Sequence, residues 1–200
     1  MSHPERESRS HLPRIETPRL ILELPHPGMA VAVADYCRRN RERLQPLEPS
    51  REPSYYTAGH WETALESARR EAQAGNGLRL MLQPRDEPGR IIGMVALSAI
   101  QRGPFQACNL GYALDGASEG HGLMREALVA LLDYTFGTLA LHRVQAACQP
   151  DNRRSLALLA LLSFRHEGFA PEYLHLAGRW CDHELLALHA PEWAARPRQP

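Results

Sequence analysis

The sequence has no excess of either charge, no long apolar run and no signal-like N-terminus, and each absence excludes a class of protein. Its 23 lysine and arginine residues balance 23 aspartate and glutamate residues, so no overall field attracts DNA, RNA or an anionic membrane. The longest apolar run, Leu156–Leu162, is much shorter than the roughly 18 residues that a transmembrane helix needs. The N-terminus is charged and carries no apolar segment of the kind found in secretory signals, which favours a cytoplasmic protein.

Cysteine and histidine also lack the spacings that bind metals. The four cysteines are far apart and form no C-x-x-C pair. They are Cys37, Cys108, Cys148 and Cys181. Without a signal segment, such cysteines are expected to be reduced core thiols. The ten histidines show no H-E-x-x-H arrangement, so the sequence predicts no metal site.

The composition is that of an ordinary globular protein, 44% hydrophobic and 23% charged. A chain of 200 residues is long enough for one domain with a full core. We predict a flexible N-terminal extension over residues 1–13, a single domain over residues 14–194 and a C-terminal tail over residues 195–200.

Strand-like and helix-like patterns alternate along this domain, which indicates an α/β or α+β fold. Strands are expected at Arg19–Leu24, Arg79–Gln83, Ile91–Ile100, Cys108–Leu114, His142–Gln149, Glu167–Leu176 and Trp180–His189. Helices are expected at Met29–Asn40, Trp61–Ala74, Leu123 to about Phe136, and Asp151–Leu162. The segment Leu44–Ser54 holds three prolines and is expected to be a structured loop. The last helix is apolar almost all round, so it is expected to be deeply buried.

A glycine-containing run, Ser118–Met124, follows the strand Cys108–Leu114 and opens a helix. Gly120 and Gly122 leave the backbone N–H groups uncovered, and unsatisfied N–H groups at a helix start favour an anion such as a pyrophosphate. The spacing is neither GxxxxGK[ST] nor GxGxxG, which excludes a P-loop and a Rossmann site. Taken alone, the pattern also fits a tight turn into a helix.

Two motifs at a characteristic separation resemble the GNAT superfamily of N-acetyltransferases. The run Glu119–Met124 falls in the register of its Q/R-x-x-G-x-G/A motif, and Asn152-x-x-Ser155 and Leu162-Ser163-Phe164 match the following helix and turn. Longer stretches resemble the Rim group, which acetylates the N-termini of ribosomal proteins. These stretches are residues 40–51, 102–112, 122–128, 173–183 and 191–193. The resemblance extends over residues 14–194.

The resemblance implies the GNAT fold and acetyl-CoA as cosubstrate. In that α/β (α+β) fold, helices flank a mixed, mostly antiparallel central sheet that is splayed between its fourth and fifth strands. The pantetheine arm is expected to pair with the backbone of Leu110–Leu114, and the pyrophosphate to lie on Glu119–Met124. The implied cofactor contacts are Leu110, Gly111, Tyr112, Ala113, Leu114, Glu119, Gly120, His121, Gly122, Leu123, Met124, Asn152 and Ser155.

The resemblance also implies how protons move. Ser155 matches a serine implicated in protonating the leaving thiolate. The tyrosine that many relatives use instead would fall at Leu159, which has no proton to donate. Glu172 matches an acidic position implicated as the base, acting through water, and Glu48 is the alternative. An ordinary first-turn serine and a solvated strand charge remain the structural alternatives for Ser155 and Glu172. Tyr112 is equally compatible with a core aromatic.

The acceptor cleft is expected between the loop Asn40–Ser54 and the hairpin Tyr173–His183. The implied substrate contacts are Glu48, Arg51, Tyr55, Tyr173, Trp180 and Asp182. Asp182 and His183 are expected either to orient each other or to line this cleft.

Two residues depart from the superfamily pattern. Glu119 stands where glutamine or arginine is usual, and a carboxylate about 6 Å from a phosphate costs roughly 1–3 kcal/mol. It is expected either to point away from the cosubstrate or to weaken its binding. Ser163 replaces the glycine of the L-G-F turn, so this turn is expected to avoid a conformation that only glycine tolerates.

The predicted function is transfer of an acetyl group to a protein N-terminal α-amine, that of an N-terminal alanine in a small-subunit ribosomal protein. Ribosome association is consistent with this function, whereas direct DNA binding and membrane binding are not expected. Two alternatives remain open. One is a small-molecule amine acetyltransferase on the same scaffold, and the other is a non-catalytic ribosome-assembly factor that binds CoA.

Overall fold

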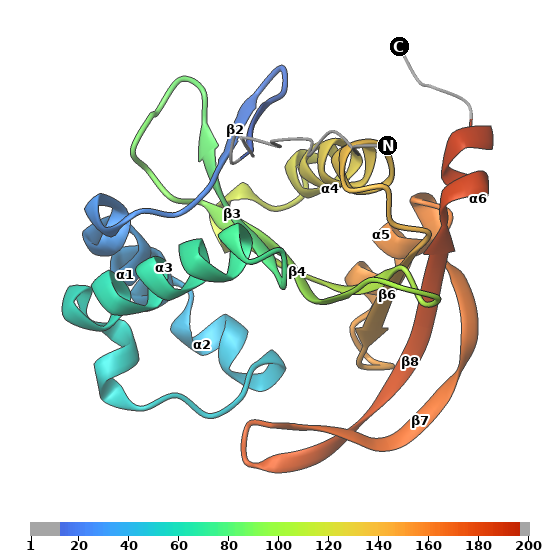
Figure 1. Ribbon diagram of the computed structural model, residues 1–200. Helices are drawn as coiled ribbons and strands as arrows, with labels where there is room; N and C mark the ends of the chain where they lie inside the picture. Colours follow the sequence, from blue (N-terminus) through green and yellow to red (C-terminus); the bar gives the residue numbers. More distant parts are fainter. Residues whose placement is uncertain (1–12, 197–200) are drawn as a thin grey trace, which may run out of the picture.

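The computed structural model describes residues 13–196, which form one eight-stranded sheet in the order β1-β2-β3-β4-β5-β6-β8-β7 (Figure 1). The strands are β1 (Arg14–Glu16), β2 (Leu20–Glu23), β3 (Leu78–Pro84), β4 (Gly93–Gln101), β5 (Ala107–Leu114), β6 (Arg143–Cys148), β7 (Arg165–Leu176) and β8 (Arg179–His189). Neighbouring strands pair antiparallel except β5 and β6, which are parallel. The mixed, mostly antiparallel sheet predicted from the sequence is therefore confirmed.

Helices cover both faces of this sheet. They are α1 (Ala30–Arg39), α2 (Arg41–Leu44), α3 (Ala58–Gln73), α4 (Leu123–Asp133), α5 (Arg153–Leu161) and α6 (Ala190–Ala195). Side chains alternate along a strand, so Leu80 and Leu82 join a core cluster with residues of α4 whereas Met81 joins a second cluster with residues of α1 and α3. None of the helices within residues 13–196 combines the length and apolar character that a membrane crossing requires.

The sheet is split at its centre, as the resemblance implies. Because β1 is additional, β5 and β6 are the fourth and fifth of the expected strands. Strands β5 and β6 pair only through Ala107–Arg143, Cys108–Val144 and Asn109–Gln145, after which they separate. Beyond that point β5 stays paired with β4, and β6 stays paired with β8. Each of the two strands thus keeps one edge of backbone N–H and C=O groups without a strand partner.

Every predicted strand and long helix is present, with ends shifted by a few residues. Three short elements, β1, α2 and α6, are additional. The helix opened by Leu123 leaves α-helical geometry after Asp133 and continues as a π-helical turn over Tyr134–Thr138. Most of the proposed N-terminal extension and the end of the tail lie outside the described residues, so the domain limits stay predictions.

The predicted deep burial of the apolar helix is wrong. Within α5 only Leu159 is buried, and Leu161 is 60% exposed. The helix lies beside the gap between β5 and β6, where Leu158, Leu159 and Leu161 line a cavity, and only Leu159 of these is a buried member of the core cluster. Its N-cap is also Asn152 rather than Asp151, because the Asn152 side chain accepts a hydrogen bond from the Ser155 amide.

The expectation for Ser163 is wrong as well. Ser163 has φ = 69°, the left-handed conformation that glycine prefers. The Phe164 amide donates to the Leu159 carbonyl and the Ser163 amide to the Ala160 carbonyl, which is the Schellman arrangement at a helix C-terminus. Leu159 and Phe164 are both buried in the core cluster and fix this turn. The turn therefore keeps its geometry despite the strain that a side chain adds.

Replacing Ser163 with glycine is expected to stabilise the protein. Left-handed backbone costs a non-glycine residue roughly 1–2 kcal/mol, and the greater freedom of glycine in the unfolded chain offsets about half of that gain. We expect Tm to rise by about 1–4 °C in thermal unfolding. The control is Ser67→Gly, the same change at an exposed position inside α3, which is expected to lower Tm. A lower Tm for Ser163→Gly would contradict the strain assigned to this turn.

Candidate active site

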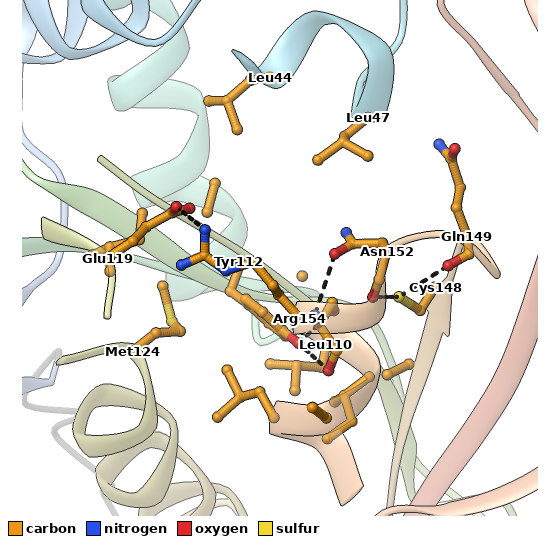
Figure 2. Close-up of a pocket in the computed structure, with 18 of the residues that line it drawn as sticks. Leu44, Leu47, Leu110, Tyr112, Glu119, Met124, Cys148, Gln149, Asn152 and Arg154 are labelled. Carbon is orange, nitrogen blue, oxygen red and sulfur yellow. Dashed lines mark hydrogen bonds and ion pairs between the residues drawn. The ribbon is translucent and has the colours of Figure 1, made fainter. Parts of the chain in front are cut away.

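A cavity of about 690 Å³ opens where β5 and β6 separate. Its walls come from β5, the loop to α4, the end of β6, α5 and the segment after α2 (Figure 2). Of the cofactor contacts implied by the sequence, all but His121 line it. The His121 carbonyl oxygen instead accepts a hydrogen bond from the Arg19 guanidinium at 2.8 Å.

The loop between β5 and α4 has the backbone geometry of an anion cradle. Gly120 and Gly122 have φ of 82° and 74°, and a Cβ at Gly120 would meet no atom within 4 Å. Open space therefore adjoins the backbone there. The first N–H groups of the eleven-residue helix α4 have no intrahelical partner and point toward this side. The loop fits a pyrophosphate, because exposed amides and the positive end of a helix dipole favour anions.

A partly buried carboxylate holds the start of α4 in place. Glu126 accepts hydrogen bonds from the Thr17 hydroxyl at 2.6 Å and from the Arg19 amide and side chain at 2.8 and 2.7 Å. Burial alone would raise the pKa of Glu126, but these hydrogen bonds outweigh it and lower the pKa below its usual value. The segment before β2 thus braces the cradle from outside the cavity.

Glu119 lies between two arginines at the cavity wall. Its carboxylate forms an ion pair with Arg43 at 2.8 Å and another with Arg154 of α5 (Figure 2). Arg43 also donates to the side chain of Asn40 at 3.2 Å and to the Leu114 carbonyl. The negative charge that the sequence placed beside the phosphates is therefore balanced by two guanidinium groups.

Tyr112 and Ser155 share a hydrogen bond inside the cavity. Their hydroxyl oxygens are 2.7 Å apart, which joins β5 to the first turn of α5. Burial raises the pKa of Tyr112 to about 12, with a smaller opposing effect from Ser155, so Tyr112 stays protonated near neutral pH. Burial likewise raises the pKa of the neighbouring Cys148 thiol, and the Ser155 hydroxyl opposes that rise. Ser155 thus lies between two protonated groups and can both accept and donate a proton.

The side of the cavity toward α2 is formed by Leu44, Leu47 and Glu48. Gln149, after β6, donates from its side chain to the Pro46 carbonyl at 3.2 Å and ties this segment to the sheet. We call the wall formed by Leu47, Glu48 and Gln149 the acceptor wall.

A smaller hollow of about 110 Å³ adjoins the main cavity, and Leu44 and Glu48 line both. Arg51 and Tyr55, two predicted substrate contacts, line this hollow, and the Arg51 guanidinium lies 4.4 Å from the centre of the Tyr55 ring. Burial raises the pKa of Glu48, whereas Arg51, at 3.5 Å, opposes the rise. A peptide could therefore approach over this charged, aromatic surface.

The remaining predicted residues lie on the β7–β8 hairpin and do not line either cavity. Glu172, Tyr173, Trp180 and Asp182 are exposed, and the Asp182 carboxylate accepts from the Glu172 amide at 2.8 Å. Their proposed roles stay predictions. His183 of the same hairpin, by contrast, is buried and lines the main cavity. It was not among the substrate contacts that the resemblance implied. Strand alternation was the available signal, because it separates His183 from its exposed neighbours.

Across residues 13–196, no group of three or more His, Cys, Asp or Glu side chains could hold a metal ion. The cavity instead offers backbone edges, an anion cradle and a pair of hydroxyl groups. A split sheet with these features suits a transferase that binds a CoA thioester. The comparison with protein families agrees: the acetyltransferase (GNAT) domain model matches residues 19–165, and the chain belongs to this family of acetyltransferases.

Similar proteins extend over nearly the whole chain. The [ribosomal protein uS5]-alanine N-acetyltransferase of Escherichia coli is 40% identical over 187 residues, covering 92% of this chain and 96% of the relative. The crystal structure of the ribosomal-protein-S5-alanine acetyltransferase from Vibrio fischeri has a TM-score of 0.85 and 34% identity, and covers 92% of this chain and all of that one. RimJ of Mycobacterium smegmatis, solved with CoA-disulfide, has a TM-score of 0.81 and 28% identity, over 86% and 83% of the two chains.

Glu119→Gln is expected to tighten CoA binding. The substitution removes a negative charge from the cavity wall and releases the guanidinium groups of Arg43 and Arg154 toward an anionic ligand. We expect Kd for CoA, measured by calorimetry, to fall roughly three- to tenfold at low salt and less at high salt. Glu87→Gln, an exposed residue of the β3–β4 turn paired with Arg90, is the control. Weaker binding by Glu119→Gln would mean that Glu119 is needed to position the arginines.

Proposed function

We propose that this acetyltransferase moves an acetyl group from acetyl-CoA to the α-amine of an N-terminal alanine in a small-subunit ribosomal protein. The observation that carries the proposal is the 40% identity to a uS5-alanine N-acetyltransferase, which extends over 92% of this chain. A ribosomal protein is made in the cytoplasm, so the proposal places the enzyme there.

The cavity supports acetyl-CoA as the donor. Beyond Asn109, β5 offers a free backbone edge over Leu110–Leu114, which suits an extended arm carrying amide groups. The glycine loop and the start of α4 suit a pyrophosphate. When bound, acetyl-CoA supplies the thioester that is the source of the acetyl group. The chain supplies the orientation of the two reactants, which is a large part of the rate enhancement in such a reaction.

An α-amine is an acceptor that this cavity can activate easily. Its ordinary pKa is about 7.7–8.0, so roughly a tenth of it is neutral at pH 7, whereas a lysine amine with pKa about 10.4 is neutral only to about 0.04%. Glu48 offers a carboxylate at the acceptor wall to attract the ammonium form. An N-terminal amine therefore needs only modest help in losing its proton.

Ser155 and Tyr112 supply the proton for the leaving group. Ser155 lines the cavity beside the free edge of β5, and its hydroxyl is 2.7 Å from that of Tyr112. Ser155 donates to the departing sulfur, and Tyr112 holds the hydroxyl and can replace its proton. Ser155 thereby takes the part that many relatives assign to a tyrosine further along the helix, where this chain has Leu159.

The proposed function is tested by the choice of acceptor. Wild-type enzyme with acetyl-CoA is offered a peptide with the N-terminal alanine of the chain's own ribosomal protein uS5, the same peptide with a blocked α-amine, and a panel of free amines. We expect acetylation of the free peptide only, read by mass spectrometry. Activity confined to free amines would overturn the proposal in favour of a small-molecule acetyltransferase.

Ser155→Ala is expected to lower kcat by roughly 100-fold or more, because the leaving sulfur loses its proton donor. Kd for CoA is expected to stay within about threefold, since the cradle and the β5 edge are unchanged. Tyr112→Phe is expected to lower kcat by about tenfold, because Ser155 keeps its place but loses one partner. Steady-state kinetics and calorimetry separate the two effects. An unchanged kcat in Ser155→Ala would remove Ser155 from the mechanism.

A further inference from the structure

His183 is a buried histidine at the cavity wall whose chemistry the reaction has not yet used. Its side chain is 3% exposed and lines the cavity together with Gln149 and Leu176. Nδ1 lies 2.9 Å from the carbonyl oxygen of Cys181. Because a carbonyl oxygen only accepts, Nδ1 carries the proton of the neutral ring, and Nε2 has a free lone pair.

This free nitrogen is not fully enclosed in the core, and His183 lines the cavity. No hydrogen bond from residues 13–196 reaches Nε2. The fully enclosed side-chain atoms without a partner in that range are on Tyr36, Arg43 and Arg79, and Nε2 is not among them. An imidazole nitrogen without a hydrogen-bond partner, on a side chain that lines a cavity, is available to accept a proton from the occupant.

Strand alternation places His183 on the opposite face of the sheet from α5. Cys148 contacts the first turn of α5, because its thiol lies 3.7 Å from the Asn152 carbonyl. Cys148 pairs in register with Glu184 of β8, and residues directly opposite each other share a face. His183, the neighbour of Glu184, therefore points to the other face.

The acceptor wall lies on that same face. Gln149 follows Cys148 in the chain, and its side chain reaches the Pro46 carbonyl away from α5. The cavity thus has Ser155 on the α5 side and His183 on the acceptor side, with the gap between β5 and β6 joining them. An amine that attacks from the acceptor side meets His183 while the thioester sulfur leaves toward Ser155.

We propose that His183 is the general base of acetyl transfer, an inference that rests on the proposed function. A bond forms between the amine nitrogen and the acetyl carbon, and the carbon–sulfur bond breaks. The amine proton passes to Nε2 of His183, directly or through one water, and the sulfur receives a proton from Ser155. His183 then releases its proton to solvent and Ser155 regains one, so the products are the acetylated amine and the free thiol.

The two carboxylates considered from the sequence are less well placed for this step. Glu48 lines the cavity and burial raises its pKa, but its carboxylate already pairs with Arg51 at 3.5 Å. The carboxylate is therefore engaged in an ion pair, whereas Nε2 of His183 has no hydrogen-bond partner among residues 13–196. Glu172 is exposed and lines neither cavity.

The first test is His183→Asn, whose amide can still donate to the Cys181 carbonyl but offers no basic nitrogen. With the alanine peptide, kcat/KM is expected to fall by about 10²- to 10⁴-fold. Kd for CoA and Tm are expected to stay close to wild type, and added imidazole is expected to restore part of the rate. His166→Asn is the matched control, because His166 belongs to the same hairpin, is 57% exposed and lines neither cavity.

A second readout needs no activity. Long-range ¹H–¹⁵N NMR of the free wild-type protein reports which ring nitrogen of His183 carries the proton, and we expect Nδ1–H. Observation of Nε2–H would overturn the proposal, and so would wild-type kcat/KM in His183→Asn. A rate loss that comes with lost CoA affinity and no imidazole rescue would make His183 structural and also overturn it.

The proposed function can be tested independently of the role of His183. If the wild type acetylates free amines but not the alanine peptide, the substrate is wrong. The same comparison of His183→Asn with wild type on the active amine then decides the role of His183.

Discussion

The separation of β5 and β6 is the constraint on which the rest of the site depends. Two parallel strands that pair for three residues and then diverge leave backbone donors and acceptors exposed along both edges. A buried polar group without a partner costs about 1–3 kcal/mol, so those edges must be met by water or by another polar chain. A bulge in β4, between Ser98 and Gln101, faces the start of β5 and adds local twist where the strands part. The opening is therefore built into the sheet.

The surrounding segments keep this opening in shape. Arg43 bridges Asn40, Leu114 and Glu119, while Arg19 bridges His121 and Glu126. Arginine suits both positions, because its planar guanidinium donates to several partners at fixed angles. The chain contains no lysine, so all of its long cationic side chains are arginines. The cradle therefore has its geometry before any ligand arrives. Pre-formed donors lose little freedom on binding, which favours both affinity and correct placement of the thioester.

Much of the fold and the donor half of the site could be predicted from the sequence. Alternating strands, Gly120-x-Gly122 and Asn152-x-x-Ser155 are local patterns, and their resemblance to a family supplied the topology. The errors have a common origin in tertiary structure. A helix that is apolar on all sides was predicted to be buried, but leucines of α5 line a cavity. Ser163 was predicted to avoid left-handed geometry, but it keeps that geometry because Leu159 and Phe164 fix the turn. Neither effect is visible in a local pattern.

The acceptor half was harder, because its residues come from segments that are distant in the sequence. Glu48, Gln149 and His183 meet only when the segment after α2, the end of β6 and β8 are brought together. Strand alternation separates His183 from its neighbour Asp182, but the sequence alone does not say which of the two alternating sets turns inward. The structure places His183 at the cavity and Glu172 outside it, which changes the chemistry assigned to this side of the cavity.

A crystal structure of the protein with acetyl-CoA is the most direct measurement. The separation of β5 and β6 predicts the pantetheine arm along Leu110–Leu114, the pyrophosphate on the amides of Gly120–Met124, and the sulfur within hydrogen-bonding reach of Ser155. Acetyl-CoA bound elsewhere, or β5 and β6 paired along their full length, would contradict the account.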